Sequence, residues 1–215
     1  MAIPLHSRQD AIKTVLSEKP SLHDDPVRGV GHRRFLSLSD RALSYLASLI
    51  TDHSITLETG NGLTTLLFAI LSQRHFSISP DKVVFERIRE YLHNHRWSVP
   101  ADDLILICAG SETVVPRESF PLLDIVLIDG NHGFPLPFID WFYTSKLLRT
   151  GGILIVDDCQ LWTGHTLKEF LMREAEWKQV FEDQQKTFGF QKIAPTSVTK
   201  DWYQQPAMME WSNIK

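Results

Sequence analysis

Hydrophobic positions between residues 43 and 193 follow two alternating patterns. Short apolar runs, typical of buried strands, alternate with stretches in which apolar residues recur every three or four positions, as on one helix face. Strands are predicted at Ile55–Glu58, His75–Ser79, Leu104–Ala109, Asp124–Ile128 and Ile153–Val156. Helices are predicted around Leu43–Ile50, Leu66–Leu71, Val84–His95, Phe138–Leu148 and Thr166–Trp177, and a turn at Thr150–Gly152. This alternation predicts an open, doubly wound sheet.

The first, fourth and fifth predicted strands are continuously apolar, which is typical of parallel strands buried on both faces. Two further strands, Trp177–Glu182 and Thr187–Ile193, have no helix between them and flank the polar turn Asp183–Lys186. They are predicted to form an antiparallel hairpin at one sheet edge. The expected fold class is therefore α/β, with a doubly wound, mostly parallel seven-stranded sheet and a C-terminal antiparallel hairpin.

The chain ends differ from this regular middle. Residues 1–36 are polar and contain several prolines, and we expect an N-terminal arm or lid there, with a short helix near Gln9–Leu16. Residues 37–200 are predicted to form one α/β domain, because 215 residues suit a single domain. Residues 201–215 would be a C-terminal tail.

Composition narrows the class of protein. The formal net charge is −4, whereas a general nucleic-acid binder is usually basic. The chain has no apolar run near the ~20 residues of a membrane span, and its first ten residues lack a signal-peptide core. Cys108 and Cys159 are too few for a disulfide framework. We expect a cytoplasmic protein that acts on a small molecule, without nucleic acid or membrane, and a homodimer is left open.

The segment Ile55–Thr65 predicts a ligand-binding turn. An apolar strand ends in Glu58 and is followed by Gly60-Asn61-Gly62 and the start of a helix. Glycine lets backbone approach a nucleotide-like ligand closely at a strand's carboxyl end. A dinucleotide fingerprint would have a third glycine where this chain has Thr65. Glu58 would repel a pyrophosphate and favour an amino group or a ribose hydroxyl.

Polar side chains follow the other predicted strands too. In open α/β sheets, ligands bind outside the carboxyl ends of the strands. Acids recur within reach of these ends, although Asp and Asn also favour turns for backbone reasons. The residues at the later ends are Ser77, Ser79 and Asp81, then Ser111 and Glu112, then Asp129, Asn131 and His132, and finally Asp157 and Asp158.

The segments Leu57–Thr65, Leu127–His132 and Leu147–Asp158 resemble class I S-adenosylmethionine-dependent methyltransferases. The first and third match the superfamily, and Ile128-Asp129-Gly130-Asn131-His132 is similar to small-molecule O-methyltransferases of the catechol and macrocin type. The resemblance extends over roughly residues 40–193. It implies a Rossmann-like methyltransferase fold and S-adenosylmethionine as the cofactor, and it leaves the methyl acceptor open.

The resemblance also assigns residues to the methyl donor. Gly60, Asn61 and Gly62 would hold its methionine part, and Glu58 would support the turn and the donor's amino group. Thr64 corresponds to a hydroxyl that binds the donor carboxylate near a helix N-terminus, where anions are favoured. Capping of the helix is a compatible role for Thr64. Ser111 would lie near the adenine.

The second strand departs from the family. Family members usually end this strand with an acid that binds both ribose hydroxyls, but this chain has Ser77 and Ser79, which share one face of the strand. A serine makes a weaker, neutral hydrogen bond. Asp81 is the alternative group for the ribose.

Asp129, Asp157 and Asp158 are expected to converge at neighbouring strand ends. Clustered carboxylates repel one another unless protons or a cation intervene, and hard divalent cations take oxygen ligands. By resemblance, these positions bind Mg²⁺, which would hold the acceptor and lower the pKa of its hydroxyl. The alternative is that Asp129 contacts the cofactor and Asp157 caps a loop. His132 is a candidate general base or a fourth metal ligand.

The favoured hypothesis is methyl transfer from S-adenosylmethionine to a hydroxyl of a small molecule, with or without Mg²⁺. A protein that binds the cofactor but has lost turnover is the second hypothesis, favoured by Ser77 and Ser79. A nucleotide-dependent oxidoreductase is the third, and both Glu58 and Thr65 oppose it.

Overall fold

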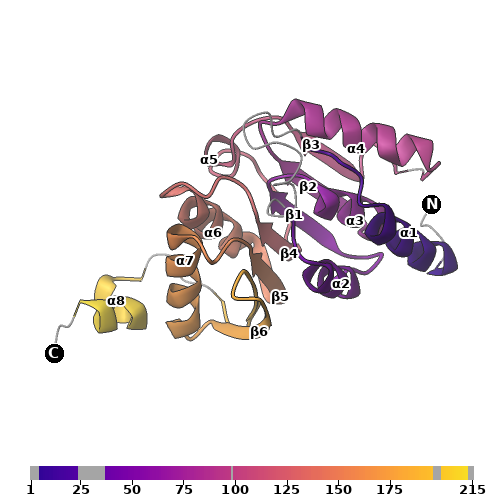
Figure 1. Cartoon of the computed structure of the whole chain (residues 1–215). Coiled ribbons are helices and arrows are strands. Elements are labelled where there is room, and N and C mark those ends of the chain that lie inside the picture. Colours follow the sequence, from indigo (N-terminus) through magenta and orange to yellow (C-terminus); the bar gives the residue numbers. More distant parts are fainter. Residues whose placement is uncertain (1–4, 24–36, 98, 196–199, 213–215) are drawn as a thin grey trace. The chain divides into compact units, whose positions relative to one another are not determined.

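The computed structural model describes residues 5–23, 37–97, 99–195 and 200–212. These belong to two compact units, residues 1–110 and residues 111–215, which are considered in turn (Figure 1). No helix in the described parts of the chain has the length and apolar character needed to cross a bilayer.

The first unit has three parallel strands in the order β3-β2-β1. Each crossover is helical, as the alternating pattern predicts, with α3 between β1 and β2 and α4 between β2 and β3. Its elements are α1 (Leu5–Glu18), α2 (Asp40–Leu49), β1 (Ile55–Thr59), α3 (Leu63–Leu71), β2 (Arg74–Ile78), α4 (Lys82–Asn94) and β3 (Leu104–Ile107). Glu58 on β1 pairs in register with Ser77 on β2, so the predicted donor residues come from adjacent strands.

The second unit has four strands in the order β4-β5-β7-β6. β4 and β5 are parallel, and β7 pairs antiparallel with both β5 and β6. Its elements are α5 (Ser111–Val114), β4 (Leu123–Ile128), α6 (Leu136–Leu147), β5 (Leu148–Val156), α7 (Trp162–Arg173), β6 (Trp177–Asp183), β7 (Thr187–Lys192), η2 (Trp202–Gln204) and α8 (Pro206–Trp211). The predicted hairpin is confirmed, and the seven strands belong to one mixed sheet.

Continuous apolar strands are buried on both faces, as predicted. On β4, Ile125, Val126 and Leu127 are buried, and so are Leu154 and Ile155 on β5. Burial of adjacent positions places side chains of both faces in the core, because successive side chains of a strand point to opposite faces. Helices therefore have to cover both faces of these strands.

The predicted turn at 150–152 lies inside β5 instead. Leu123 pairs with Leu148, and the next pair on β4 is Ile125 with Ile153, so four residues of β5 oppose one residue of β4. Gly151 has a φ of +89° in this irregular stretch, a conformation that favours glycine. The glycine signal was correct, but it marks a bulge within a strand rather than the strand's start.

The predicted start of the last helix is wrong. α7 begins at Trp162, four residues before the predicted start at Thr166, and it ends at Arg173. The Thr166 hydroxyl donates to the Trp162 carbonyl at 2.7 Å, a bond within the helix that satisfies the side chain without ending the helix. Glu169, also within the helix, forms ion pairs with Lys168 and Arg173.

The N-terminal segment includes a longer helix than the one predicted near Gln9–Leu16. α1 runs over Leu5–Glu18 and buries Ala11 and Val15 in the first unit. Leu22 is also buried, and its carbonyl accepts a hydrogen bond from Arg87 of α4 at 2.8 Å. The remainder of the predicted arm, at 1–4 and 24–36, lies outside the described residues.

The contact between α1 and α4 is expected to weaken as pH rises above about 6.5, the ordinary pKa of histidine. The Glu18 carboxylate accepts from Tyr91 Oη at 2.7 Å and lies 3.0 Å from His95 Nε2. A backbone hydrogen bond to Tyr91 and the contact with Glu18 raise the pKa of His95, while hydrogen bonds from Tyr91 and His95 lower the pKa of Glu18. Stabilisation by His95 is therefore present below its unfolded pKa and is lost as pH rises through its folded pKa.

Amide hydrogen exchange in α1, corrected for intrinsic rates, measures this effect. Opening of α1 should be more frequent at pH 8 than at pH 6 in the parent protein. Glu18→Gln removes the charge that favours protonated His95, so the pH dependence should shrink. An equal pH dependence in both proteins would contradict the assignment.

Candidate functional site

The glycine turn after β1 requires glycine at one position in particular. Gly60 has a φ of +101°, which residues with a side chain rarely adopt. Its N–H donates to the Ile78 carbonyl at 2.9 Å and ties the turn to the end of β2. His23 also contacts the turn, with Nε2 2.9 Å from the Asn61 carbonyl oxygen. A Cβ atom at Gly62 would lie 3.3 Å from His23 Nε2, so glycine also permits this close packing.

Glu58 lies beneath the turn as the acceptor of a buried network. Its side chain is 1% exposed. The Thr64 hydroxyl donates to Oε2 at 2.7 Å, the Thr65 hydroxyl donates to Oε1, and His75 Nε2 is 3.2 Å from Oε1. The carboxylate therefore supports the turn from inside the protein. The Thr64 hydroxyl, which was expected to bind a donor carboxylate, is directed to Glu58.

Thr65 has a role that the sequence reasoning missed. Its hydroxyl accepts from the Gly62 N–H at 2.8 Å while donating to Glu58. The hydroxyl thus satisfies one of the backbone donors at the start of α3 that have no partner within the helix. The departure from the third glycine of a dinucleotide fingerprint was visible in the sequence, and the structure gives its physical consequence.

The remaining predicted donor residues of the first unit form a connected edge beside the turn. Ser77 is buried and donates to the Gly60 carbonyl at 3.0 Å. Ser79 accepts from the Asp81 N–H at 3.2 Å, and Asn61 donates to the Asp81 carbonyl at 3.1 Å. Asp81 is exposed and caps α4 by accepting from the Val84 N–H at 3.1 Å. Asn61, Ser77, Ser79 and Asp81 are therefore brought together, and Asp81 supplies an exposed carboxylate to this group.

In the second unit, Asp129 and Asp158 lie with His132 at the carboxyl ends of β4 and β5. One ligand atom from each residue lies within 4.8 Å of the other two. His132 Nε2 is 2.9 Å from Asp158 Oδ2. Ligand distances of about 2.0–2.6 Å from a central ion are compatible with this spacing. The imidazole of His132 suits a transition metal such as Zn²⁺, whereas the two carboxylates also suit Mg²⁺ or Mn²⁺.

Asp157 is engaged elsewhere. Its buried carboxylate accepts from Lys186 Nζ and from the Thr187 hydroxyl, both at the hairpin between β6 and β7. Lys186 Nζ also lies 3.3 Å from Asp158 Oδ1. The structure therefore brings together Asp129, Asp158 and His132 from the predicted metal residues and pairs Asp157 with an ammonium group.

Charge at this cluster is balanced by its neighbours. Burial alone would raise the pKa of Asp158, but hydrogen bonds from His132 and Gln160 and the charge of Lys186 hold it well below its usual range. Burial would lower the pKa of Lys186, but the carboxylates of Asp157, Asp158 and Asp129 raise it overall. Asp158 is therefore ionised and Lys186 protonated near neutral pH.

The first turn of α7 positions this cluster. A Cβ atom at Gly164 would lie 2.7 Å from the Asp158 carbonyl oxygen, so only glycine allows the helix to approach so closely. The Thr163 hydroxyl donates to the His132 carbonyl. Sequence reasoning identified neither Gly164 nor Thr163, because both precede Thr166, where the last helix was predicted to begin.

Two large aromatic side chains are exposed next to this cluster. Phe134 and Trp162 are 67% and 66% exposed, and their ring centroids are 5.8 Å apart. They are close in sequence to His132 and Thr163, and Leu161 is exposed as well. A contiguous exposed apolar patch is more informative than a single exposed side chain, because such patches mark binding surfaces.

Ser111, the predicted adenine neighbour, is buried at the start of α5.

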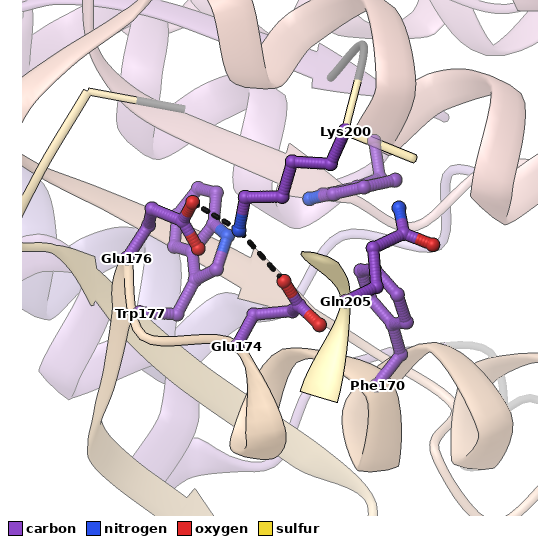
Figure 2. A pocket seen from close by; sticks show the side chains of 7 residues that line it. Phe170, Glu174, Glu176, Trp177, Lys200 and Gln205 are labelled. Carbon is purple, nitrogen blue, oxygen red and sulfur yellow. Dashed lines mark hydrogen bonds and ion pairs between the residues drawn. The ribbon is translucent and has the colours of Figure 1, made fainter. Parts of the chain in front are cut away.

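A pocket of about 210 Å³, including its open mouth, lies in the second unit. It is lined by Trp141, Phe170, Glu174, Glu176, Trp177, Lys200 and Gln205 (Figure 2). Lys200 Nζ lies 2.9 Å from Glu174 and pairs with Glu176, and Ala207 of α8 is fully buried. Lys200 and Gln205 of the C-terminal segment therefore form part of the pocket wall, and none of the predicted site residues lines it.

The chain matches no protein-family model and no curated protein. Solved structures do match. The O-methyltransferase TomG from Streptomyces achromogenes, in complex with S-adenosylmethionine, has a TM-score of 0.61 at 18% identity, over 84% of this chain and 90% of that protein. A methyltransferase from Geobacter sulfurreducens has a TM-score of 0.55 at 15% identity, over 90% and 93%.

An rRNA methylase from Streptococcus thermophilus also matches, with a TM-score of 0.53 at 17% identity, over 70% of this chain and 93% of that protein. At these identities the likeness shows a shared fold. The predicted Rossmann-like fold class is confirmed, while the fold alone hosts methyltransferases for different acceptors.

Proposed function

We propose that the protein transfers a methyl group from S-adenosylmethionine to a hydroxyl of a small molecule. The observation that carries this proposal is the turn Gly60–Gly62 at the carboxyl end of β1, supported from beneath by the buried carboxylate of Glu58. This feature occurs in a fold shared with methyltransferases, one of which is an O-methyltransferase in complex with S-adenosylmethionine.

On the donor side, the turn would hold the methionine part of the donor. Asn61 links the turn to the loop of Asp81, whose exposed carboxylate is the proposed partner of the ribose hydroxyls. Ser77 is less suited to that role because its hydroxyl already donates to Gly60. Ser111 remains the proposed neighbour of the adenine.

On the acceptor side, His132 is the proposed general base. When Nε2 carries a proton and hydrogen-bonds to Asp158, Nδ1 is the basic nitrogen. Asp158 then fixes the orientation of the ring. The acceptor oxygen attacks the methyl carbon as the carbon–sulfur bond breaks, the sulfonium becomes a neutral thioether, and His132 Nδ1 takes the hydroxyl proton. Positioning is most of what the protein supplies in such a displacement.

A divalent cation held by Asp129, His132 and Asp158 would supply a different route to the same end, by binding the acceptor oxygen and lowering the pKa of its hydroxyl. In that case His132 is a ligand rather than the base. Asp157 is less suited as a ligand because it is paired with Lys186. Phe134 and Trp162 favour an acceptor with an apolar face near the reacting hydroxyl.

A second candidate function is donor binding without turnover. It is favoured by Ser77 in place of the acid that binds the ribose, and by the Thr64 hydroxyl that is directed to Glu58.

Calorimetry with S-adenosylhomocysteine and with NAD tests the donor class. We expect S-adenosylhomocysteine to bind and NAD not to bind. Undetectable binding of S-adenosylhomocysteine, or binding of NAD alone, would overturn the proposal. Methyl transfer to hydroxylated acceptors, with an rRNA fragment as the contrasting acceptor, then separates the candidates. Turnover of a small molecule supports the enzyme, turnover of RNA alone replaces the acceptor, and binding without turnover supports the second candidate.

A further inference from the structure

His75 is a fully buried histidine that no step of the proposed reaction uses. It lies on β2 with 0% exposure. Its Nδ1 is 2.8 Å from the Thr56 hydroxyl, and its Nε2 is 3.2 Å from Glu58 Oε1. The imidazole also stacks on Phe68 of α3, with ring centroids 4.5 Å apart and planes at 13°. Both ring nitrogens thus have partners, and the plane of the ring is fixed.

These contacts assign the proton. Both oxygens of the Glu58 side chain accept hydrogen bonds from threonine hydroxyls, so we assign the proton to His75 Nε2, which donates to Glu58 as well. Nδ1 is then the acceptor for the Thr56 hydroxyl. The hydrogen bonds therefore run in one direction: the Thr56 hydroxyl donates to His75, and His75 donates to Glu58.

Glu58 Oε1 joins this chain to the glycine turn. The oxygen accepts from both His75 and Thr65, and the Thr65 hydroxyl in turn accepts from the Gly62 N–H at 2.8 Å. If His75 were absent, Oε1 would lose one of its two donors and the carboxylate could rotate about its side chain. The Thr65 hydroxyl and the Gly62 N–H depend on that orientation.

Packing alone does not require an imidazole here. An apolar side chain would fill the space against Phe68 without burying two polar nitrogens, which is costly unless both are hydrogen-bonded. The imidazole is matched to Glu58 by its Nε2 proton and to Thr56 by its Nδ1 lone pair. The feature that needs this side chain is therefore the orientation of the carboxylate.

We propose that His75 is a positioning residue for methyl-donor binding. It acts through Glu58 and Thr65 to hold Gly62 and the turn in the shape that accepts the donor. The inference rests on the proposed function, since it concerns the affinity of the same turn for S-adenosylmethionine. His75 itself does not touch the donor, because Glu58 and the turn lie between them.

Calorimetry with S-adenosylhomocysteine, together with thermal unfolding, tests this role in the full chain. His75→Leu keeps an apolar contact with Phe68 but removes the donor to Glu58, and a hydrogen bond to a charged group of this kind corresponds to about ten- to hundredfold in affinity. His75→Gln offers an amide N–H in nearly the same place, so it should recover most of that loss. Ile88→Val is the matched control: it is fully buried on α4 and should lower the unfolding temperature without changing affinity.

The outcomes are distinguishable. A parent protein that fails to bind S-adenosylhomocysteine overturns the proposed function and this inference with it. A parent that binds, with His75→Leu binding as tightly, overturns the positioning role alone. Equal losses in His75→Gln, His75→Leu and Ile88→Val would mean that affinity only follows stability, which also overturns it. If His75→Leu does not fold, His75→Phe decides, because it keeps a ring against Phe68 but offers no N–H to Glu58: binding should be weaker than in His75→Gln, and binding as tight as that of the parent would contradict the role.

Discussion

Glu58→Leu is expected to lower the free energy of unfolding of the first unit by about 3–5 kcal/mol and to abolish donor binding. The leucine leaves the Thr64 and Thr65 hydroxyls and the His75 N–H buried without their acceptor. Each unsatisfied buried donor costs about 1–3 kcal/mol, and rotation of the hydroxyls recovers part of that sum. The measurement is urea unfolding followed by circular dichroism, extrapolated to water, with S-adenosylhomocysteine calorimetry on the folded fraction.

Glu58→Gln is the matched control because it keeps the shape and one acceptor oxygen. Its loss should be about 1–2 kcal/mol, since one donor can still be satisfied by the amide oxygen and the others lose a charged partner. A leucine variant within 1 kcal/mol of the parent would mean that the network does not support the turn.

Local spacing was sufficient to predict the strands of the core. A continuous apolar run at Ile125–Ile128 reports burial on both faces, and burial on both faces is what a parallel strand requires. The residues after each strand could be identified in the same way, because the carboxyl ends of parallel strands lie at one sheet edge. This is why Glu58, Asp129 and Asp158 were found from sequence at the ends of β1, β4 and β5.

Partners from distant parts of the chain could not be predicted in this way. Asp157 and Asp158 are adjacent and chemically alike, but one is paired with Lys186 of the hairpin and the other lies with His132. The difference arises from the positive φ of Asp158, +53°, and from the antiparallel packing of β7 on β5. Neither the positive φ nor the strand packing can be inferred from the hydrophobic periodicity of the sequence. In the same way, the last helix was predicted to begin at Thr166, but α7 begins at Trp162, where Gly164 lets its first turn pack on Asp158.

Lys186 provides the second large effect, because it neutralises a buried carboxylate next to the Asp129–His132–Asp158 cluster. Lys186→Met removes the ammonium from Asp157, which is buried. Breaking a buried pair from one side leaves an uncompensated charge and costs about 3–5 kcal/mol, and we expect about 2–4 kcal/mol because Lys186 is partly exposed. The same change removes a positive charge 3.3 Å from Asp158, so the cluster should bind a divalent cation more tightly.

Thermal unfolding of Lys186→Met and the parent, each with and without Mn²⁺, measures both effects. The variant should unfold at a lower temperature, and Mn²⁺ should raise its unfolding temperature more than that of the parent, since a ligand that binds only the folded state stabilises it by mass action. Lys178→Met, on the exposed face of β6 in the same hairpin, is the control and should change neither quantity. A Lys186→Met protein as stable as the parent would mean that Asp157 is not held by this charge. A Mn²⁺ shift in neither protein would mean that Asp129, His132 and Asp158 do not form a cation site, and His132 would then remain as the base.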